Sequence, residues 1–174
     1  RFFGRTIRSR SLERIVEEVK AFAAHGATRL SVSGGTGSLY GSGSGEMNPD
    51  AFIALLRGMA EVMGPRNVSS PDIRVDCITD EILDAVRRYT IGWVFFGIES
   101  GSDRVLRMMG KGATVRQVEE AVERCREHDL RVAGSFIVGY PGETERDYEA
   151  TKDLIAALSL DDVFVSSAEP IPGT

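Results

Sequence analysis

A chain of 174 residues is long enough to bury a hydrophobic core and fits one compact domain. Hydrophobic residues make up 42% of the chain and charged residues 27%, and these proportions exclude disordered and fibrous classes. The 21 basic and 26 acidic residues give a formal net charge of -5, so there is no strong nucleic-acid signal, and only a local basic stripe is compatible with this balance.

Helical and strand patterns alternate along the chain. A first helix is predicted over residues 12–24, where Ser11 is the N-cap, Gly26 is the stop and Phe22 faces inward. Further helices are predicted to begin at capping residues, which are Asn48, Thr79, Ser102, Thr114 and Thr144. Strands are predicted between the helices, at residues 29–34, 67–70, 91–98, 131–138 and 162–168.

The spacing of these strands predicts the fold class. Residues 91–98, IGWVFFGI, form a nearly continuous apolar run, which is typical of a strand buried on both faces. One strand per thirty-odd residues, with a helix between strands, is the βα repeat of a parallel sheet. A full (β/α)8 barrel takes about 250 residues, so we expect an α/β protein built as a partial TIM-type barrel. An open α/β sheet, or a piece of either fold, is the alternative.

An unusual segment follows each predicted strand. These segments are residues 35–37, 71–76, 99–102, 139–144 and 169–170. In a parallel α/β fold the carboxyl ends of the strands form one rim, and ligands bind there. The sequence therefore predicts a small-molecule site at this rim.

Three of these segments suit a nucleotide-like ligand, and each has a plain structural alternative. The glycines of SGGTG (residues 33–37) expose backbone N–H groups to a carboxylate or phosphate, or they form a tight turn. Glu99 can accept both hydrogen bonds of a ribose diol, or it can be an acid beside the helix start at Ser102. Residues 137–139, followed by a Pro-Gly turn, can pack on a flat ligand such as adenine, or they can lead into a rigid capped turn.

Cysteine and histidine usage limits metal and disulfide chemistry. Cys77 and Cys125 lack a C-x-x-C spacing, which excludes a disulfide framework and suits a reducing, cytoplasmic location. Cys125 is predicted in a helix core, whereas Cys77 lies in a loop where a ligand or redox role is an alternative. His25 and His128 are predicted at helix C-terminal ends, so no metal site is expected within the chain. No apolar run approaches the ~20 residues that span a bilayer, and we expect no membrane partner.

The segments GRTIRSRS, SGGTG, SSPDIRVD, ESGSDRVLRMMGK and SFIVGYPGETERDYEAT, taken in this order, resemble the core of radical S-adenosylmethionine (SAM) enzymes. The nearest groups are the methylthiotransferase-like branch and the cobalamin-binding-domain branch. The resemblance implies a (β/α)6-like partial barrel and a [4Fe-4S] cluster on a CxxxCxxC loop after the first strand. It also implies reductive cleavage of SAM to a 5′-deoxyadenosyl radical, used for methyl or methylthio transfer.

The resemblance also implies which residues contact SAM. Gly34, Gly35 and Thr36 match the element at its methionyl amino group. Glu99 and Ser100 match the element at its ribose. Ile137, Val138 and Gly139 match the element at its adenine. Gly134 and Glu143 match structural positions of the adenine element. Polar residues expected at the rim, as candidates for substrate contact, are Arg10, Ser70, Arg74 and Lys111. The arginines of the first ten residues have a plain alternative, which is ion pairing with Glu13, Glu17 and Glu18.

The sequence departs from the family pattern in two places. Thr36 stands where the family element usually ends in Glu, and no CxxxCxxC occurs anywhere in the chain. We therefore expect residues 1–174 to be a single radical SAM core-type domain that lacks the first strand and the cluster loop and is cut at its C-terminus. Such a fragment is expected to be inactive alone; a degenerate family member is the alternative. Glu99 stands where methylthiotransferases more often carry Gln, which favours the cobalamin branch.

Two other functions are compatible with the residues. One is a non-radical TIM-barrel enzyme with a phosphate-binding rim, in which Glu99 or Lys111 serves as general base. The other is a non-catalytic scaffold domain. Within the lead hypothesis the substrate is left open between RNA, protein and a small molecule, because no side chain selects among them.

Overall fold

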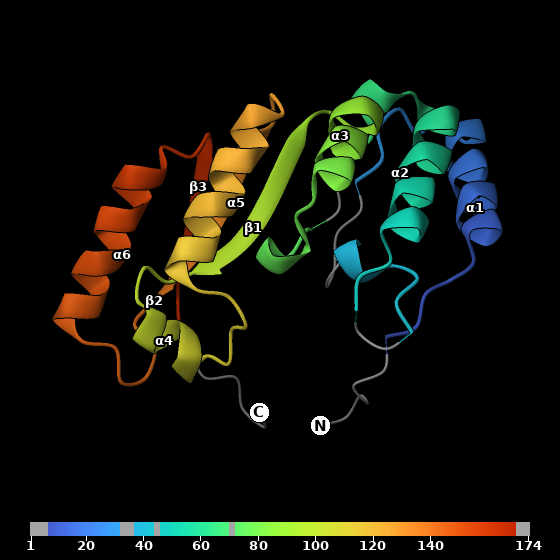
Figure 1. Ribbon diagram of the computed structural model, residues 1–174. Coiled ribbons are helices and arrows are strands. Elements are labelled where there is room, and N and C mark those ends of the chain that lie inside the picture. Colours follow the sequence, from blue (N-terminus) through green and yellow to red (C-terminus); the bar gives the residue numbers. More distant parts are fainter. Residues whose placement is uncertain (1–6, 32–36, 44–45, 70–71, 170–174) are drawn as a thin grey trace.

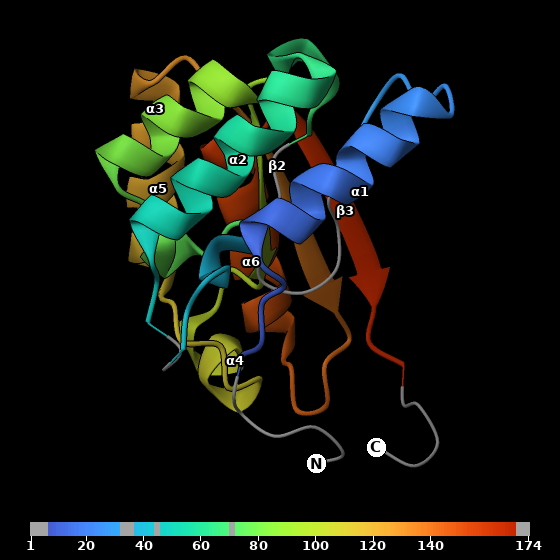
Figure 2. The same cartoon turned by 90° about the vertical axis from the view of Figure 1, so that its right-hand side faces the viewer.

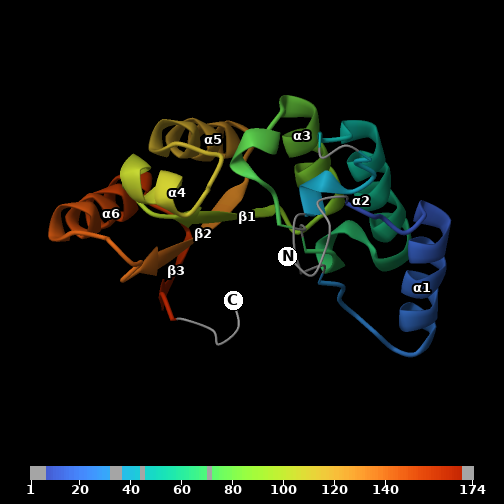
Figure 3. The same ribbon diagram turned by 90° about the horizontal axis from the view of Figure 1, so that it is seen from below.

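The computed structural model describes residues 7–31, 37–43, 46–69 and 72–169 (Figure 1). Its sheet has three parallel strands in the order β1 (Trp93–Glu99), β2 (Arg131–Val138) and β3 (Asp162–Ser167). The helices lie along one side of the sheet, and the chain forms an arc that is open on the other side (Figure 3). This arrangement confirms the predicted partial barrel.

Two further extended segments continue the parallel sheet beyond β1, each joined by isolated backbone hydrogen bonds. Leu30 and Val68 form a parallel bridge, and the Ile91 amide donates to the Val68 carbonyl at 2.9 Å. The described residues of the predicted strands at 29–34 and 67–70 thus form one bridge rather than full strands. The remaining residues of those two predicted strands lie outside the described ranges.

The helices begin and end close to the predicted residues. Their bounds are α1 (Leu12–Ala24), α2 (Pro49–Met63), α3 (Asp80–Tyr89), α4 (Asp103–Met108), α5 (Val115–Glu127) and α6 (Glu145–Leu158), with short 3-10 turns η1 (Gly37–Leu39), η2 (Pro65–Asn67) and η3 (Val75–Cys77). Ser11, Asn48 and Thr79 accept backbone N–H bonds as N-caps. His25 and His128 are C-caps, as predicted. Among the described residues no helix has the length and apolar character needed to cross a membrane.

Strand β1 is buried on one face only. Val94, Phe96 and Ile98 are 0 to 1% exposed and pack towards the helices, whereas Phe95 and Gly97 face the open side and are half-buried. The prediction of burial on both faces is wrong for this reason: side chains alternate along a strand, and the arc leaves the inner face uncovered. The inner face of β1 is therefore available to a ligand.

Helix α1 departs from its predicted burial. Helices α1, α2 and α3 lie side by side (Figure 2), and Val19 of α1 is 3% exposed. A Cβ on Gly58 of α2 would lie 3.0 Å from Cγ2 of Val16, so the missing side chain allows the two helices to approach closely. Phe22, predicted to face inward, is 48% exposed, because α1 packs on α2 through another part of its apolar face.

Gly101, in the loop after β1, lies directly against α6. A Cβ built on this residue would fall 2.4 Å from the carbonyl oxygen of Ala150 and 2.6 Å from Cα of Thr151. The Gly101 amide also donates to Thr151 Oγ1 at 3.0 Å. Because the obstructing atoms belong to the helix backbone, only glycine permits this approach.

Replacing Gly101 with alanine should therefore separate the loop from α6. We expect Gly101→Ala to lower the free energy of unfolding by about 2 to 3 kcal/mol, as overpacking does in closely packed interiors. Urea denaturation of the full chain measures this change. Gly43→Ala is the matched control, because a Cβ there has no atom within 4 Å. Equal stability of the two variants would contradict the packing constraint.

Candidate SAM site

A cavity of about 540 Å³ lies at the carboxyl ends of the strands, on the open side of the sheet. Four segments of the chain supply its wall: residues 72–76, the inner face of β1, the loop between α4 and α5, and β2. The lining residues are Asp72, Ile73, Arg74, Val75, Asp76, Phe95, Gly97, Glu99, Gly110, Lys111, Gly112, Ala113 and Ser135. A volume of this size is within the range of small-molecule and cofactor sites.

Glu99 ends β1 in a strained conformation at the edge of this cavity. Its φ of 71° is in the left-handed region that non-glycine residues rarely adopt, and the pairing with β2 shifts register between Gly97 and Glu99. Its Oε1 lies 2.9 Å from Nζ of Lys111, and the two side chains are 20% and 34% exposed. Strained residues of this kind are concentrated at functional sites, where surrounding contacts hold them in place.

Gly97 provides the space that this ion pair occupies. A Cβ on Gly97 would lie 2.8 Å from Oε1 of Glu99 and 3.1 Å from Nζ of Lys111. Both atoms belong to side-chain ends rather than to backbone. A side chain at residue 97 would consequently displace the two charges from the cavity wall while leaving the strand in place.

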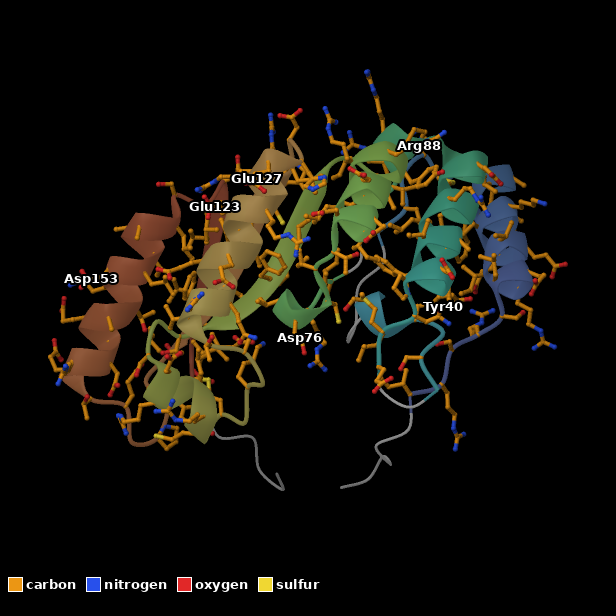
Figure 4. All side chains as sticks on the ribbon, viewed as in Figure 1. Tyr40, Asp76, Arg88, Glu123, Glu127 and Asp153 are labelled. Carbon is orange, nitrogen blue, oxygen red and sulfur yellow. The ribbon has the colours of Figure 1, made fainter. Side chains whose placement is uncertain are left out.

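A second ion pair lines the same cavity. Arg74 donates from Nε to Oδ1 of Asp76 at 2.7 Å and from Nη2 to Oδ2 at 2.5 Å, which is a bidentate contact. The hydrogen bonds from Arg74 hold the pKa of the Asp76 carboxyl below its usual value. Asp76 belongs to η3, and Figure 4 shows it near the middle of the molecule, well below Arg88. The cavity is thus bordered by one charged pair from η3 and another from β1 and the loop after α4.

The structure gathers some of the predicted site residues and separates others. Glu99, Arg74 and Lys111 line the cavity, whereas the other described candidates do not. Gly34, Gly35, Thr36 and Ser70 lie outside the described residues. Arg10 pairs with Glu18 at 2.5 Å, as the ion-pair alternative predicts.

The remaining candidates lie behind or beyond the cavity. Ser100 is fully buried; its hydroxyl accepts from the Ser102 amide at 3.1 Å and lies 3.3 Å from Thr151 Oγ1. Ile137 and Val138 are half-buried at the end of β2, and Gly139 follows them with an exposed backbone. The roles proposed for these residues stay predictions.

Sequence reasoning overlooked several residues of the cavity wall. Phe95, Gly97 and Ser135 were not among the candidates, yet strand alternation places the first two on the same face as Glu99. Asp76 was overlooked as the partner of Arg74, although it is only two residues away. The alternation was a usable signal, whereas Ser135 joins the wall only through its register with Gly97.

Asp147 at the start of α6 joins the two most specific motifs of the sequence. Its Oδ1 accepts from the Ser102 hydroxyl at 2.6 Å, and its Oδ2 accepts from the Thr144 amide at 2.9 Å. Arg104 forms an ion pair with the same carboxylate and donates to the Gly142 carbonyl at 2.8 Å. These donors, with Arg104 the strongest, hold the pKa of Asp147 far below its usual range. ESGSDR and GETERD are therefore held to each other by one buried carboxylate.

The chain's own residues do not fit an iron–sulfur cluster. Cys77 and Cys125 are both buried, and burial raises the pKa of the Cys125 thiol to about 12. Burial likewise raises the pKa of Cys77, so neither thiol favours the thiolate form that binds iron. Within the described ranges no three His, Cys, Asp or Glu side chains are grouped as a metal site. The predicted core position of Cys125 is confirmed.

Comparison with known proteins decides the family. The model of the radical SAM superfamily matches residues 2–155. This chain belongs to that superfamily. A coproporphyrinogen III oxidase of Escherichia coli, described as a radical SAM enzyme, superposes with a TM-score of 0.70 at 17% identity, covering 92% of this chain and 38% of that chain. A radical SAM methyltransferase from Kitasatospora setae has a TM-score of 0.73 at 20% identity, over 93% of this chain and 32% of that one.

Two curated relatives are similar to this chain over nearly its whole length. A putative methylthiotransferase of Methanocaldococcus jannaschii is 55% identical over 174 residues, which is 100% of this chain and 38% of that protein. A tRNA-2-methylthio-N(6)-dimethylallyladenosine synthase of Paracoccus denitrificans is 30% identical over 171 residues, covering 95% of this chain and 38% of that protein. The chain thus spans well under half of the length of these relatives.

The Asp147 network predicts an acid-sensitive contribution to stability. Because the pKa of Asp147 is lower in the folded than in the unfolded state, its contribution to stability is complete above a pH of about 5 and is lost as the pH falls further. We expect Asp147→Asn to lower the urea midpoint at neutral pH and to flatten the fall in midpoint between about pH 5 and 2.

Asp153→Asn, on the exposed side of α6 (Figure 4), is the matched control and should keep the wild-type profile. Urea titrations at several pH values measure both variants. Identical acid profiles for Asp147→Asn and the wild type would show that this carboxylate does not link the two motifs energetically.

Proposed function

We propose that this chain is the SAM-binding portion of a radical SAM enzyme that transfers a methylthio or methyl group. The observation that carries the proposal is the strained Glu99, paired with Lys111 on the wall of the cavity at the carboxyl ends of the strands. Membership of the superfamily supports it, and favours it over a phosphate-binding TIM-barrel enzyme or a scaffold.

Glu99 and Lys111 would hold the ribose of SAM. An ionised carboxylate has about four acceptor positions, so a bond from Lys111 to one oxygen leaves capacity for two ribose hydroxyls. The ion pair with Lys111, which is partly shielded from solvent, fixes the orientation of this carboxylate. The end of β2, where Ile137 and Val138 are half-buried and Gly139 is exposed, would receive the adenine ring.

The role of this chain is to bind and orient SAM rather than to cleave it. In the family, SAM bound at a [4Fe-4S] cluster supplies a 5′-deoxyadenosyl radical. Because the cysteines of this chain do not fit such a cluster, we place its ligands outside these 174 residues and expect the chain alone to be inactive. Residues 1–174 would then form one core-type domain of a longer protein.

Methylthio transfer to RNA is the reaction that we favour. The relative with 55% identity is called a putative methylthiotransferase, and the relative with 30% identity is named for a modified adenosine of tRNA. A role for cobalamin, inferred from Glu99 in place of Gln, stays a prediction. The cytoplasmic location likewise stays a prediction.

Removing the Glu99 carboxylate should abolish most SAM binding. We expect the full chain to bind SAM weakly in calorimetry, because the contacts that a cluster makes to the methionyl group are absent. Glu99→Ala should weaken binding at least about tenfold, since hydrogen bonds to charged groups contribute roughly 1.5–3 kcal/mol. Glu99→Gln, which keeps the shape of the side chain, should lose less, and Glu119→Ala on the exposed side of α5 is the neutral control. Tight binding that is indifferent to Glu99→Ala would refute this placement of the ribose.

Gly97→Ala tests the same site without removing either charge. The new Cβ would displace Glu99 and Lys111 from the cavity wall, and we expect SAM affinity to fall severalfold. The obstructed atoms are side-chain ends, so the free energy of unfolding should fall by no more than about 1 kcal/mol. Calorimetry and urea denaturation separate the two effects. Full SAM affinity in this variant would show that the ion pair is not part of the binding surface.

A further inference from the structure

Arginines gather at the end of the molecule opposite the cavity. Four extended segments lie parallel to one another, at Leu30, at Val68, in β1 and in β2, and one or two arginines come just before or at the start of each. We call this set the arginine arc, and it consists of Arg29, Arg66, Arg87, Arg88 and Arg131. Figure 4 shows Arg88 at the end of the molecule where α3 ends, far from Asp76 beside the cavity.

Backbone hydrogen bonds place these segments side by side. The Leu30 amide donates to the Asn67 carbonyl at 2.8 Å, the Ile91 amide to Val68 at 2.9 Å, and the Arg131 amide to Gly92 at 2.9 Å. Neighbouring strands lie about 4.8 Å apart, so the four segments that carry the arc span about 15 Å. The arginines are therefore one row of charges rather than scattered surface residues.

The arc is exposed and takes part in none of the ion pairs of the described residues. All five side chains are exposed, and within the described part of the chain none of them forms an ion pair. Arg88 lies over the ring of Tyr89 at 5.4 Å and Arg131 over that of Trp93 at 5.6 Å. Stacking of this kind directs a guanidinium group along the surface and leaves its N–H groups available.

The helix dipole does not explain the row. It accounts for Arg87 and Arg88 in the last turn of α3, but Arg29 and Arg131 stand at extended segments, which have no such dipole. The arc ends before β3, because Asp161 precedes this strand and Asp162 begins it in place of an arginine. Exposed acids also lie near the arc in sequence, namely Asp84, which contacts His128, and Glu127 and Asp129 before β2.

We propose that the arginine arc binds the phosphate backbone of an RNA. The planar guanidinium fork matches phosphate oxygens, and a row of such forks matches the regular charges of a polynucleotide. Ile91, which is 47% exposed, and the half-buried rings of Tyr89 and Trp93 adjoin the row and offer apolar contact to bases. The choice of RNA rather than an acidic protein rests on the proposed function.

Because the arc lies away from the cavity, it would contribute to RNA affinity and not to the reaction at the cavity. Ser135 of the cavity wall is four residues after Arg131 in β2, so the arc lies about 13 Å from the near edge of the cavity along the strand. A folded RNA that reached the cavity while held by the arc would be gripped at both ends of the barrel. Removal of the arc should then weaken RNA binding without altering SAM binding.

Anisotropy of a fluorescein-labelled tRNA transcript, titrated with the full chain at about 50 to 200 mM salt, tests the proposal. The variant carries Arg66→Gln, Arg88→Gln and Arg131→Gln. Each phosphate contact contributes about 0.7 to 0.9 to the slope of log affinity against log salt, so the slope should become shallower by about 2. Affinity at the lowest salt should fall at least about tenfold. The assay contains no SAM, so its outcome is independent of the proposed SAM site.

The matched control carries Arg14→Gln, Arg57→Gln and Arg116→Gln, which removes the same charge from exposed positions of α1, α2 and α5. It should keep the wild-type slope. An equal loss in both variants, or no tRNA binding by the wild type, would overturn the proposal. If poly-glutamate displaced the tRNA as effectively as unlabelled tRNA of equal charge concentration, the arc would be a site for an acidic protein and the RNA proposal would be wrong. Unchanged circular dichroism melting verifies that the variants are folded.

Discussion

The carboxylate of Asp147 is the contact on which the geometry of the site depends. It receives hydrogen bonds from Ser102 and Thr144 and an ion pair from Arg104, and so joins the loop after β1 to the start of α6. Gly101 permits this approach because a Cβ there would collide with the helix backbone. A buried carboxylate with this many donors is stable only when all of them are in place, so the loop has one conformation.

The fixed loop explains how Glu99 can hold an unfavourable backbone conformation. Glu99 directly precedes Ser100, whose side chain is fully buried between Thr151 and Ser102. The chain must therefore turn sharply at residue 99, and it does so with a φ of 71°. This turn directs the carboxylate to Lys111, while Gly97 leaves room for both groups. The motif ESGSDR thus positions Glu99 on the cavity wall through contacts of Ser100 and Ser102 that lie outside the cavity.

The two ends of the barrel differ in how their charges are compensated. At the cavity the cations are paired within the protein, as Lys111 is with Glu99 and Arg74 with Asp76. Such pairs hold donors and acceptors in fixed positions, which suits recognition of a small polar molecule. At the opposite end the arginines carry no acidic partner in the described ranges, which suits a partner that brings its own negative charge. One chain of net charge -5 therefore presents two different electrostatic surfaces.

Local sequence determined the helices, their caps and the rim, because capping residues and hydrophobic periodicity act within a few positions of the chain. Glu99, Arg74 and Lys111 were accordingly predictable as rim residues, and the structure brings them to one cavity. Only the tertiary structure decided that Ser100 is buried, that Ser135 joins the wall and that Phe22 is exposed. Each of these depends on which elements pack together, through strand register, the α6 contact and the part of α1 that meets α2. Contacts between residues far apart in the chain leave no periodic pattern in either segment, and so they could not be derived from the sequence alone.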